Sequence, residues 1–174
     1  ATNRRRNWVD PMIMDRIEEF AQALPATGAL IGLDLGTKTI GVAISDGLRS
    51  VATPVETIKR AKFNLDRQQL EAHIHTRDIK GLILGLPRKM DGSEGPRCQS
   101  TRAFARNLSS HITIPIGFWD ERLSTVAAEK ALLEADTSRR RRAEVIDHVA
   151  ASYILQGVLD RLCHIHAQNA AVTR

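Results

Sequence analysis

The spacing of hydrophobic positions changes several times along the chain, and each change predicts a different element. From residue 29 onward, short runs of apolar and β-branched residues are separated by polar segments that contain glycine or proline, which is typical of strands. Five such runs predict strands, at residues 29–34, 39–45, 50–58, 81–87 and 112–119.

The segments between and after the later strands have apolar residues three or four positions apart, which indicates helices. Helices are predicted at about residues 64–75, 96–108, 123–135 and 141–164. Short glycine-containing turns join the first three strands, so these strands should form an antiparallel meander. The β–α alternation that follows favours parallel strands. The sequence therefore predicts one α/β domain, with a mixed five-stranded sheet and helices on both faces.

The segments at the two ends fall outside this predicted domain of residues 29–164. Residues 1–10 resemble a flexible basic arm, and Pro11 stands where a helix could begin, with an apolar stripe that continues to Leu24. Residues 1–28 are therefore expected to be a basic arm with an appended helix. Residues 165–174 are expected to form a flexible tail.

Composition places the chain among ordinary folded proteins. It has 174 residues, of which 43% are hydrophobic and 26% are charged, and no run approaches the length of about 20 apolar residues that a bilayer span needs. Its two cysteines, Cys98 and Cys163, are too few for a disulfide framework or a zinc site. A cytoplasmic protein without membrane contact is therefore expected.

The positive charge of the chain is concentrated in two places. The arginine runs 4–6 and 139–142 together hold seven positive charges, more than the net charge of +5, so the rest of the chain is slightly acidic. Such patches permit binding to a polyanion by counterion release. A solvated basic surface is the alternative interpretation of any single run.

Asp34 is the first candidate for chemistry. It ends the first predicted strand, on the face that it shares with Leu30 and Gly32, and Gly36 follows it. A carboxylate at the end of a hydrophobic strand is unfavourable unless something pairs with it, and a metal ion is one such partner. Capping of a turn is the alternative role.

Asp120 and Glu121 follow the predicted strand 112–119 at its carboxyl end, where open sheets place ligand sites. Because adjacent residues point in different directions, only one of the two is expected to reach a site. Asp120 could instead cap the helix that follows. Glu121 is therefore the better candidate ligand.

Asp147 lies on the apolar stripe of the last predicted helix, together with Ala150 and Ala151, whose small side chains would let the helix approach the sheet closely. An exposed acid near the helix start is the alternative. Asp34, Glu121 and Asp147 come from separate elements and could together hold one or two Mg²⁺ or Mn²⁺ ions for phosphodiester hydrolysis. These three residues are the predicted catalytic and metal-binding set.

Residues 88–97 form a loop before the predicted helix at Pro96, and two glycines lie in it. Backbone N–H groups at the start of that helix could bind a phosphate oxygen, and Arg88, Lys89 and Arg97 add positive charge. Arg102 and Arg106, four residues apart on the helix, would extend this basic track, with a solvated pair as the alternative. A plain connecting loop is the alternative.

Four segments resemble the motifs of one family. The run IGLDLGTKTIGVAISD at residues 31–46 resembles the first motif of the YqgF-type proteins, also described as Holliday-junction-resolvase-like proteins and as nucleases that mature the small-subunit ribosomal RNA precursor. Residues 81–108, 120–135 and 146–160 resemble the later motifs, in the same order. The resemblance covers nearly all of residues 29–160.

This resemblance implies an RNase H-like fold and places the family's acidic positions on Asp34, Glu121 and Asp147. Lys38 stands at a position that is often basic in the family, whereas Thr39 replaces a common arginine. Substrate contacts are expected from the first motif, the loop and the residue after Glu121, namely Gly36, Thr37, Lys38, Arg88, Asp91, Gly92, Arg97 and Arg122.

The implied function is metal-dependent cleavage of structured RNA, in processing the 5′ end of pre-16S rRNA within a ribosomal precursor particle, by a monomer or homodimer. A resolvase acting on branched DNA is one alternative, since the same acids would serve it. A non-catalytic RNA- or ribosome-binding factor is another. An actin-type ATPase also has a DLGT motif, but that class needs two facing domains and this chain supplies one.

Overall fold

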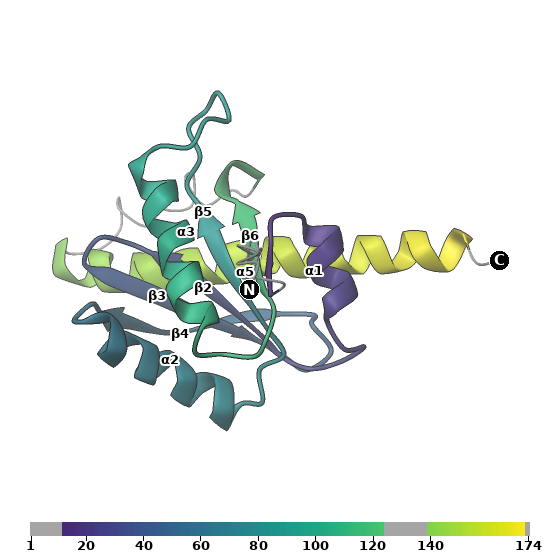
Figure 1. The fold of residues 1–174 in the computed structure, drawn as a ribbon, viewed down its shortest axis with the longest axis horizontal. Coiled ribbons are helices and arrows are strands. Elements are labelled where there is room, and N and C mark those ends of the chain that lie inside the picture. The colour runs from purple at the N-terminus through teal and green to yellow at the C-terminus, as the bar shows by residue number, and fades with distance from the viewer. Residues whose placement is uncertain (1–11, 124–138, 173–174) are drawn as a thin grey trace, which may run out of the picture.

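The computed structural model describes residues 12–123 and 139–172, the side chains of residues 139–147 excepted (Figure 1). These ranges contain six strands, with helices between some of them and after the last. In chain order they are β1 (Ile13–Met14), α1 (Ile17–Ala23), β2 (Leu30–Leu35), β3 (Thr39–Ser45), β4 (Ala52–Lys59), α2 (Phe63–Thr76), β5 (Gly81–Leu86), α3 (Pro96–Ser109), β6 (Ile116–Asp120), the short 3₁₀ helix η1 (Glu121–Leu123) and α5 (Arg139–Val172).

The strands form one mixed sheet in the order β1-β6-β5-β2-β3-β4. Strand β3 runs antiparallel to β2 and β4, whereas β2, β5, β6 and β1 run parallel to one another. The predicted α/β fold, with an antiparallel meander followed by parallel strands, is confirmed. Because β2, β5 and β6 are parallel, their carboxyl ends share one edge of the sheet, where ligand sites form in such folds.

Helices cover both faces of the sheet (Figure 1). Helices α2 and α3 pack on one face, whose core includes Leu33, Leu84 and Phe118. Helices α5 and α1 pack on the other, whose core includes Ile83 and Trp119. Every residue of β2 and β5 is buried, as expected for central strands with both faces covered. No helix within the described ranges is long and apolar enough to cross a bilayer.

The N-terminal segment differs from the single helix predicted over residues 11–24. Residues Ile13 and Met14 instead form β1, which pairs with β6, and the helix begins only at Ile17. The backbone N–H of Ile116 donates to the carbonyl of Met12 at 2.6 Å, so this short strand satisfies groups on the edge of β6. The prediction of a five-stranded sheet is therefore wrong: the sheet has six strands, and β1 is the additional edge strand.

The C-terminal helix is longer than predicted. Helix α5 continues to Val172 and extends past the sheet (Figure 1), so residues 165–172 are helical where a flexible tail was expected. Strand β6 is shorter than the predicted strand and begins at Ile116. Leu123, the first residue of the helix predicted at residues 123–135, ends η1. The rest of that predicted helix and the arm at residues 1–10 lie outside the described residues.

Small residues let α5 approach the sheet closely. A Cβ atom at Gly32 on β2 would lie 2.7 Å from the Cβ of Leu155 and 3.3 Å from the carbonyl oxygen of Ala151. Ala150 and Ala151 are themselves fully buried. The expectation that the two alanines permit a close approach is therefore confirmed, with Gly32 as their counterpart on the sheet.

Gly32→Ala should destabilise the protein by about 1–3 kcal/mol, because the added methyl group overpacks this contact. Urea unfolding followed by circular dichroism measures the change. The control is Gly47→Ala, since a Cβ at Gly47 has no neighbour within 4 Å. The control should stay within about 0.5 kcal/mol of the original chain. Equal stability of the two variants would contradict the close packing.

Candidate active site

Asp34 is a buried carboxylate at the carboxyl end of β2, only 5% exposed. Its neighbours Leu33 and Leu35 face the core beneath α2 and α3. Because side chains alternate along a strand, Asp34 shares the opposite face with Gly32, whose α-carbon lies against α5. The carboxylate therefore lies on the α5 face of the sheet. This agrees with the prediction that Asp34 shares a face with Leu30 and Gly32.

Glu121 reaches the same face from the neighbouring end of β6. Along β6, Phe118 faces the α2–α3 core and Trp119 faces the α5 core. The side chain of Glu121 continues toward α5. Its Oε1 atom lies 2.7 Å, and its Cγ 3.3 Å, from the position that a Cβ of Gly85 would take. The Glu121 carboxylate thus occupies space over β5 that the missing side chain of Gly85 leaves open.

The register of the sheet relates these two acids. Leu33 of β2 pairs with Leu84 of β5, so the next residues along the two parallel strands are Asp34 and Gly85. Glu121 covers Gly85 on the face to which Asp34 also belongs. The structure therefore brings two of the three predicted acids to one face, at the carboxyl edge of three parallel strands.

The third predicted acid, Asp147, lies in α5, one helical turn before Ala151. Helix α5 runs antiparallel to β4, since Gln156 contacts Ala52 and His148 contacts Thr57. Strand β4 runs in the direction of β2, so position 147 lies toward the carboxyl end of β2. Among the described side chains, no group of three or more His, Cys, Asp or Glu could hold a metal ion, and the side chain of Asp147 is outside that description.

Asp120 points to the other face and has a structural role. Its carboxylate accepts the backbone N–H of Arg122 at 3.0 Å and pairs with the Arg122 guanidinium at 2.6 Å. The hydrogen bonds from Arg122 hold the pKa of Asp120 below its ordinary value. Asp120 therefore caps the 3₁₀ turn η1, whereas the helix that it was expected to cap lies outside the described residues. Glu121 is left as the acid that faces α5.

Arg122 in turn supports the loop at residues 88–97. Its guanidinium donates to the carbonyl of Met90 at 3.4 Å and lies 3.3 Å from the position of a Cβ on Gly92. Gly92 has a φ of 87°, which favours glycine. Arg122, predicted to bind substrate, therefore ties this loop to the end of β6.

The loop is also shaped by its own polar groups. Asp91 accepts the backbone N–H of Ser93 at 2.9 Å and its hydroxyl at 2.6 Å. These hydrogen bonds lower the pKa of Asp91 below its ordinary value, and the one from the Ser93 hydroxyl has the larger effect. Arg88 lies 3.8 Å from Glu94. Asp91 and Arg88, both predicted to bind substrate, thus make contacts within the loop.

The predicted basic track along α3 is not supported at Arg102. Its guanidinium pairs with Glu94 and with Asp15, each at 2.6 Å, and lies over the ring of Phe118 at 4.9 Å. The hydrogen bonds that Arg102 donates to the carboxylates of Glu94 and Asp15 raise the pKa of Arg102. This charge is neutralised within the fold, where it joins the N-terminal segment to α3.

The other predicted substrate-binding residues are available to a ligand. Thr37, Lys38 and Arg97 are exposed. Gly36 begins a tight turn directly after β2, in which its N–H donates to the carbonyl of Thr39 at 2.9 Å. The carbonyl of Gly36 accepts a hydrogen bond from Arg60 at 2.7 Å. Lys38 therefore stands at the same edge of the sheet as Asp34.

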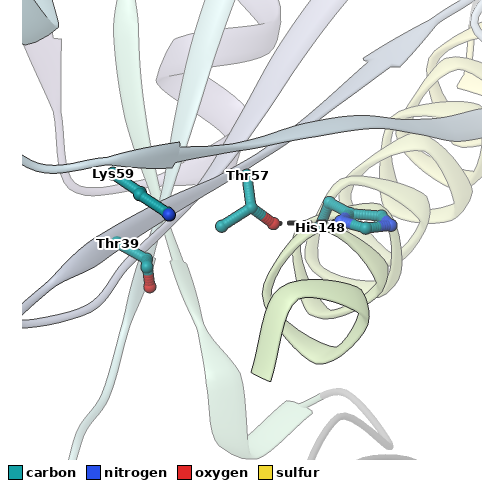
Figure 2. A pocket seen from close by; sticks show the side chains of 4 residues that line it. All are labelled: Thr39, Thr57, Lys59 and His148. Carbon is teal, nitrogen blue, oxygen red and sulfur yellow. Dashed lines mark hydrogen bonds between the residues drawn. The ribbon is translucent and has the colours of Figure 1, made fainter. Parts of the chain in front are cut away.

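Sequence reasoning missed two features of this region. One is Gly85, whose only signal was a glycine inside an apolar strand. The other is a pocket of about 180 Å³ on the α5 face, to which β3, β4 and α5 contribute (Figure 2). Its lining residues are Thr39, Thr57, Lys59 and His148. For the pocket, the signal in the sequence was that His148 directly follows Asp147, a predicted metal ligand.

The sequence of this chain matches a known family and several named relatives. The family described as "RuvX: Holliday junction resolvase" matches residues 28–161. A protein of Ruegeria sp. (strain TM1040) named "Putative pre-16S rRNA nuclease" is 72% identical over 156 residues, which are 90% of this chain and 99% of the relative. A protein of the same name from Paracoccus denitrificans (strain Pd 1222) is 70% identical over 151 residues, 87% of this chain and 96% of the relative.

Solved structures show a more distant likeness. T. thermophilus RuvC in complex with a Holliday junction substrate aligns with 78% of this chain and 96% of its own, at 11% identity and a TM-score of 0.48. At that distance the likeness adds nothing to the assignment of individual residues.

Asp120→Asn should lower the stability at neutral pH, because it removes the ion pair with Arg122. The pKa of Asp120 is lower in the folded chain than its ordinary value of 3.8. The stabilisation is therefore full above pH 3.8 and is lost as the pH falls below it toward the folded-state pKa. Urea unfolding of both chains across this range measures the difference, and a difference that persists undiminished in strong acid would contradict the assignment.

Proposed function

This chain belongs to the RuvX family, described as Holliday junction resolvases, and we propose that it is a nuclease that hydrolyses phosphodiester bonds in structured RNA. The names of its relatives favour the precursor of 16S rRNA as the substrate. We expect that the chain processes the 5′ end of this RNA, within a ribosomal precursor particle in the cytoplasm. The observation that carries the proposal is the convergence of Asp34 and Glu121 on one face at the carboxyl edge of the sheet.

The donor set fits a hard divalent cation. Carboxylate oxygens are the ligands that Mg²⁺ and Mn²⁺ prefer. The missing side chain of Gly85 leaves room for the Glu121 carboxylate beside the strand that carries Asp34. Asp34, Glu121 and Asp147 would hold one or two such ions. When bound, the ions would activate water and stabilise the charge that develops on the phosphodiester.

The remaining parts of the edge would bind and orient the substrate. Lys38 and Arg97 are exposed near the carboxyl ends of β2 and β5 and supply positive charge for phosphate groups. Backbone N–H groups at the start of α3 add donors. Arg122 acts indirectly, because its contact with Met90 holds the loop against the end of β6.

Branched DNA is a second candidate substrate, since the family is described by its resolvase activity. The acids at the edge of the sheet would serve either polymer, because the reacting group is the same phosphodiester. Side-by-side cleavage of an RNA that carries the precursor 5′ end and of a four-way DNA junction distinguishes the two.

Asp34→Asn should reduce RNA cleavage in Mg²⁺ by at least about 100-fold, the scale on which loss of one charge-stabilising group acts. The readout is a gel assay of the precursor RNA, with EDTA lanes to test for metal dependence. The purified variant should keep the circular dichroism spectrum of the original chain.

Asp78→Asn is the matched control, because Asp78 is exposed and pairs with Lys80 just before β5, at the opposite edge of the sheet. Its φ of 50° is one that asparagine tolerates. Cleavage that persists in Asp34→Asn identifies a contaminating nuclease or a wrong active site. If the original chain cuts only the four-way junction, the RNA assignment is wrong; if it cuts neither substrate, the nuclease proposal fails.

Gly85→Ala should lower cleavage by about tenfold or more, because the new Cβ would lie 2.7 Å from Glu121 Oε1 and would displace that carboxylate. The control is again Gly47→Ala, which meets no neighbour within 4 Å. The comparison is made at a temperature at which both variants are fully folded. Unchanged cleavage by Gly85→Ala would exclude Glu121, in the position described, from the reaction.

A further inference from the structure

Two short segments meet at the edge of the sheet where β2 ends. The turn at residues 36–38 joins β2 to β3, and the connection at residues 60–62 joins β4 to α2. Strands β2 and β4 both run antiparallel to β3, so the two segments lie at the same edge. Neither segment contains an acidic residue. Together they expose three cationic side chains, those of Lys38, Arg60 and Lys62.

Arg60 joins the two segments to each other. Its backbone N–H donates to the carbonyl of Lys38 at 2.9 Å, and its guanidinium donates to the carbonyl of Gly36 at 2.7 Å. The guanidinium also lies over the ring of Phe104 on α3, 5.9 Å from the ring centre, within the range of a cation–π contact. Arg60 therefore ties the turn after β2 both to the connection before α2 and to α3.

The backbone of the connection is held at its other two residues as well. The N–H of Ala61 donates to the carboxylate of Asp66 at 3.0 Å, and Asp66 is buried, with 1% of its surface exposed. The carbonyl of Lys62 accepts the N–H groups of Leu65 at 3.0 Å and of Asp66 at 3.2 Å. The exposed cations therefore project from a fixed backbone. A ligand that binds such a surface has less chain to order than one that binds a flexible loop.

This surface adjoins the candidate active site. Gly36 follows Asp34 by two residues, so their α-carbons are at most about 7 Å apart. A guanidinium has five N–H donors in a planar fork, so Arg60 keeps donors for a ligand after its bond to Gly36. Exposed cations on two neighbouring segments fit the repeating negative charge of a nucleic acid backbone.

We propose that Lys38, Arg60 and Lys62 bind backbone phosphates of the substrate strand beside the phosphodiester at Asp34, and that Arg60 also holds the turn. The choice of a polynucleotide rests on the proposed function, whereas the charge and the fixed backbone are features of the surface itself. The strand would leave Asp34 over the turn at residues 36–38. It would continue toward the start of α2, on the side of the sheet that α2 and α3 cover (Figure 1).

The test is RNA binding without cleavage, measured by fluorescence anisotropy of a fluorescein-labelled single-stranded RNA with the precursor 5′ end, in EDTA and over a series of KCl concentrations. Arg60→Gln and Lys62→Gln should each reduce the slope of log K against log[salt] by about 0.7, the value for one single-strand phosphate contact. The double variant should lose about 1.4 in slope, which at about 0.1 M salt corresponds to about a 25-fold loss of affinity.

Arg77→Gln is the matched control for Arg60→Gln, because it removes the same charge from an exposed residue at the other end of α2, about 20 Å away along the helix. Lys80→Gln is the control for Lys62→Gln, because Lys80 pairs with Asp78 at the opposite edge of the sheet. Both controls should bind RNA with the original affinity and slope.

Arg60→Lys separates the charge of Arg60 from its hold on the turn. It keeps the positive charge but replaces the planar fork with a single ammonium group. It should therefore bind RNA with the original salt slope. If Arg60 has only a structural role, the slope stays unchanged in Arg60→Gln too, and the phosphate contact assigned to Arg60 is wrong.

The original slope in both Arg60→Gln and Lys62→Gln would overturn the proposal, whether or not the chain cuts RNA. Equal losses in Arg77→Gln and Lys80→Gln would overturn it too, since the effect would then be one of diffuse charge. Either result concerns binding alone and leaves the assignment of Asp34 standing. Conversely, a slope that depends on Arg60 and Lys62 in a chain that cuts neither RNA nor the four-way junction would sink the nuclease proposal and keep the binding surface.

Discussion

The close contact between α5 and the centre of the sheet is the constraint on which the rest of the structure depends. At Gly32 the helix leaves no space for even one methyl group, and at Gly85 the space is shared by Ile154 and the Glu121 carboxylate. Asp34 is buried on this same face. The helix that completes the hydrophobic core therefore packs on the face that carries Asp34 and Glu121, and the two glycines that admit it also shape the candidate active site.

Successive side chains at the end of β6 point to opposite faces of the sheet, so Asp120 and Glu121 have different surroundings. Asp120 faces away from α5, pairs with Arg122 and through it holds the loop after β5. Glu121, one residue later, faces α5 and lies over Gly85. Adjacent acids with similar chemistry are thus separated by the sheet, so that one is neutralised by an arginine and the other shares a face with Asp34. This separation keeps the structural ion pair apart from the proposed metal ligands.

The elements that the sequence predicted correctly are those whose partners are close in the chain or whose burial is uniform. The meander from Leu30 to Lys59 has tight turns, and β5 is apolar on both faces, so local patterns were sufficient. The strand β1 was missed because two residues gain their strand conformation only from pairing with β6, about a hundred positions later. Local spacing there favoured a helix, and a long-range pairing prevailed.

By itself, the sequence determined which acids end which elements, because strand ends and alternation follow from local hydrophobicity. It therefore singled out Asp34 and Glu121, which the structure places on one face, and it predicted that Asp120 and Glu121 point in different directions, as they do. Only the tertiary structure decided that Arg102 is neutralised by Asp15 and Glu94, and that Thr57 lies in register with Asp34 through Gly41. Those relations depend on the register between strands and on helix placement, which arise from packing of the whole chain rather than from any local pattern.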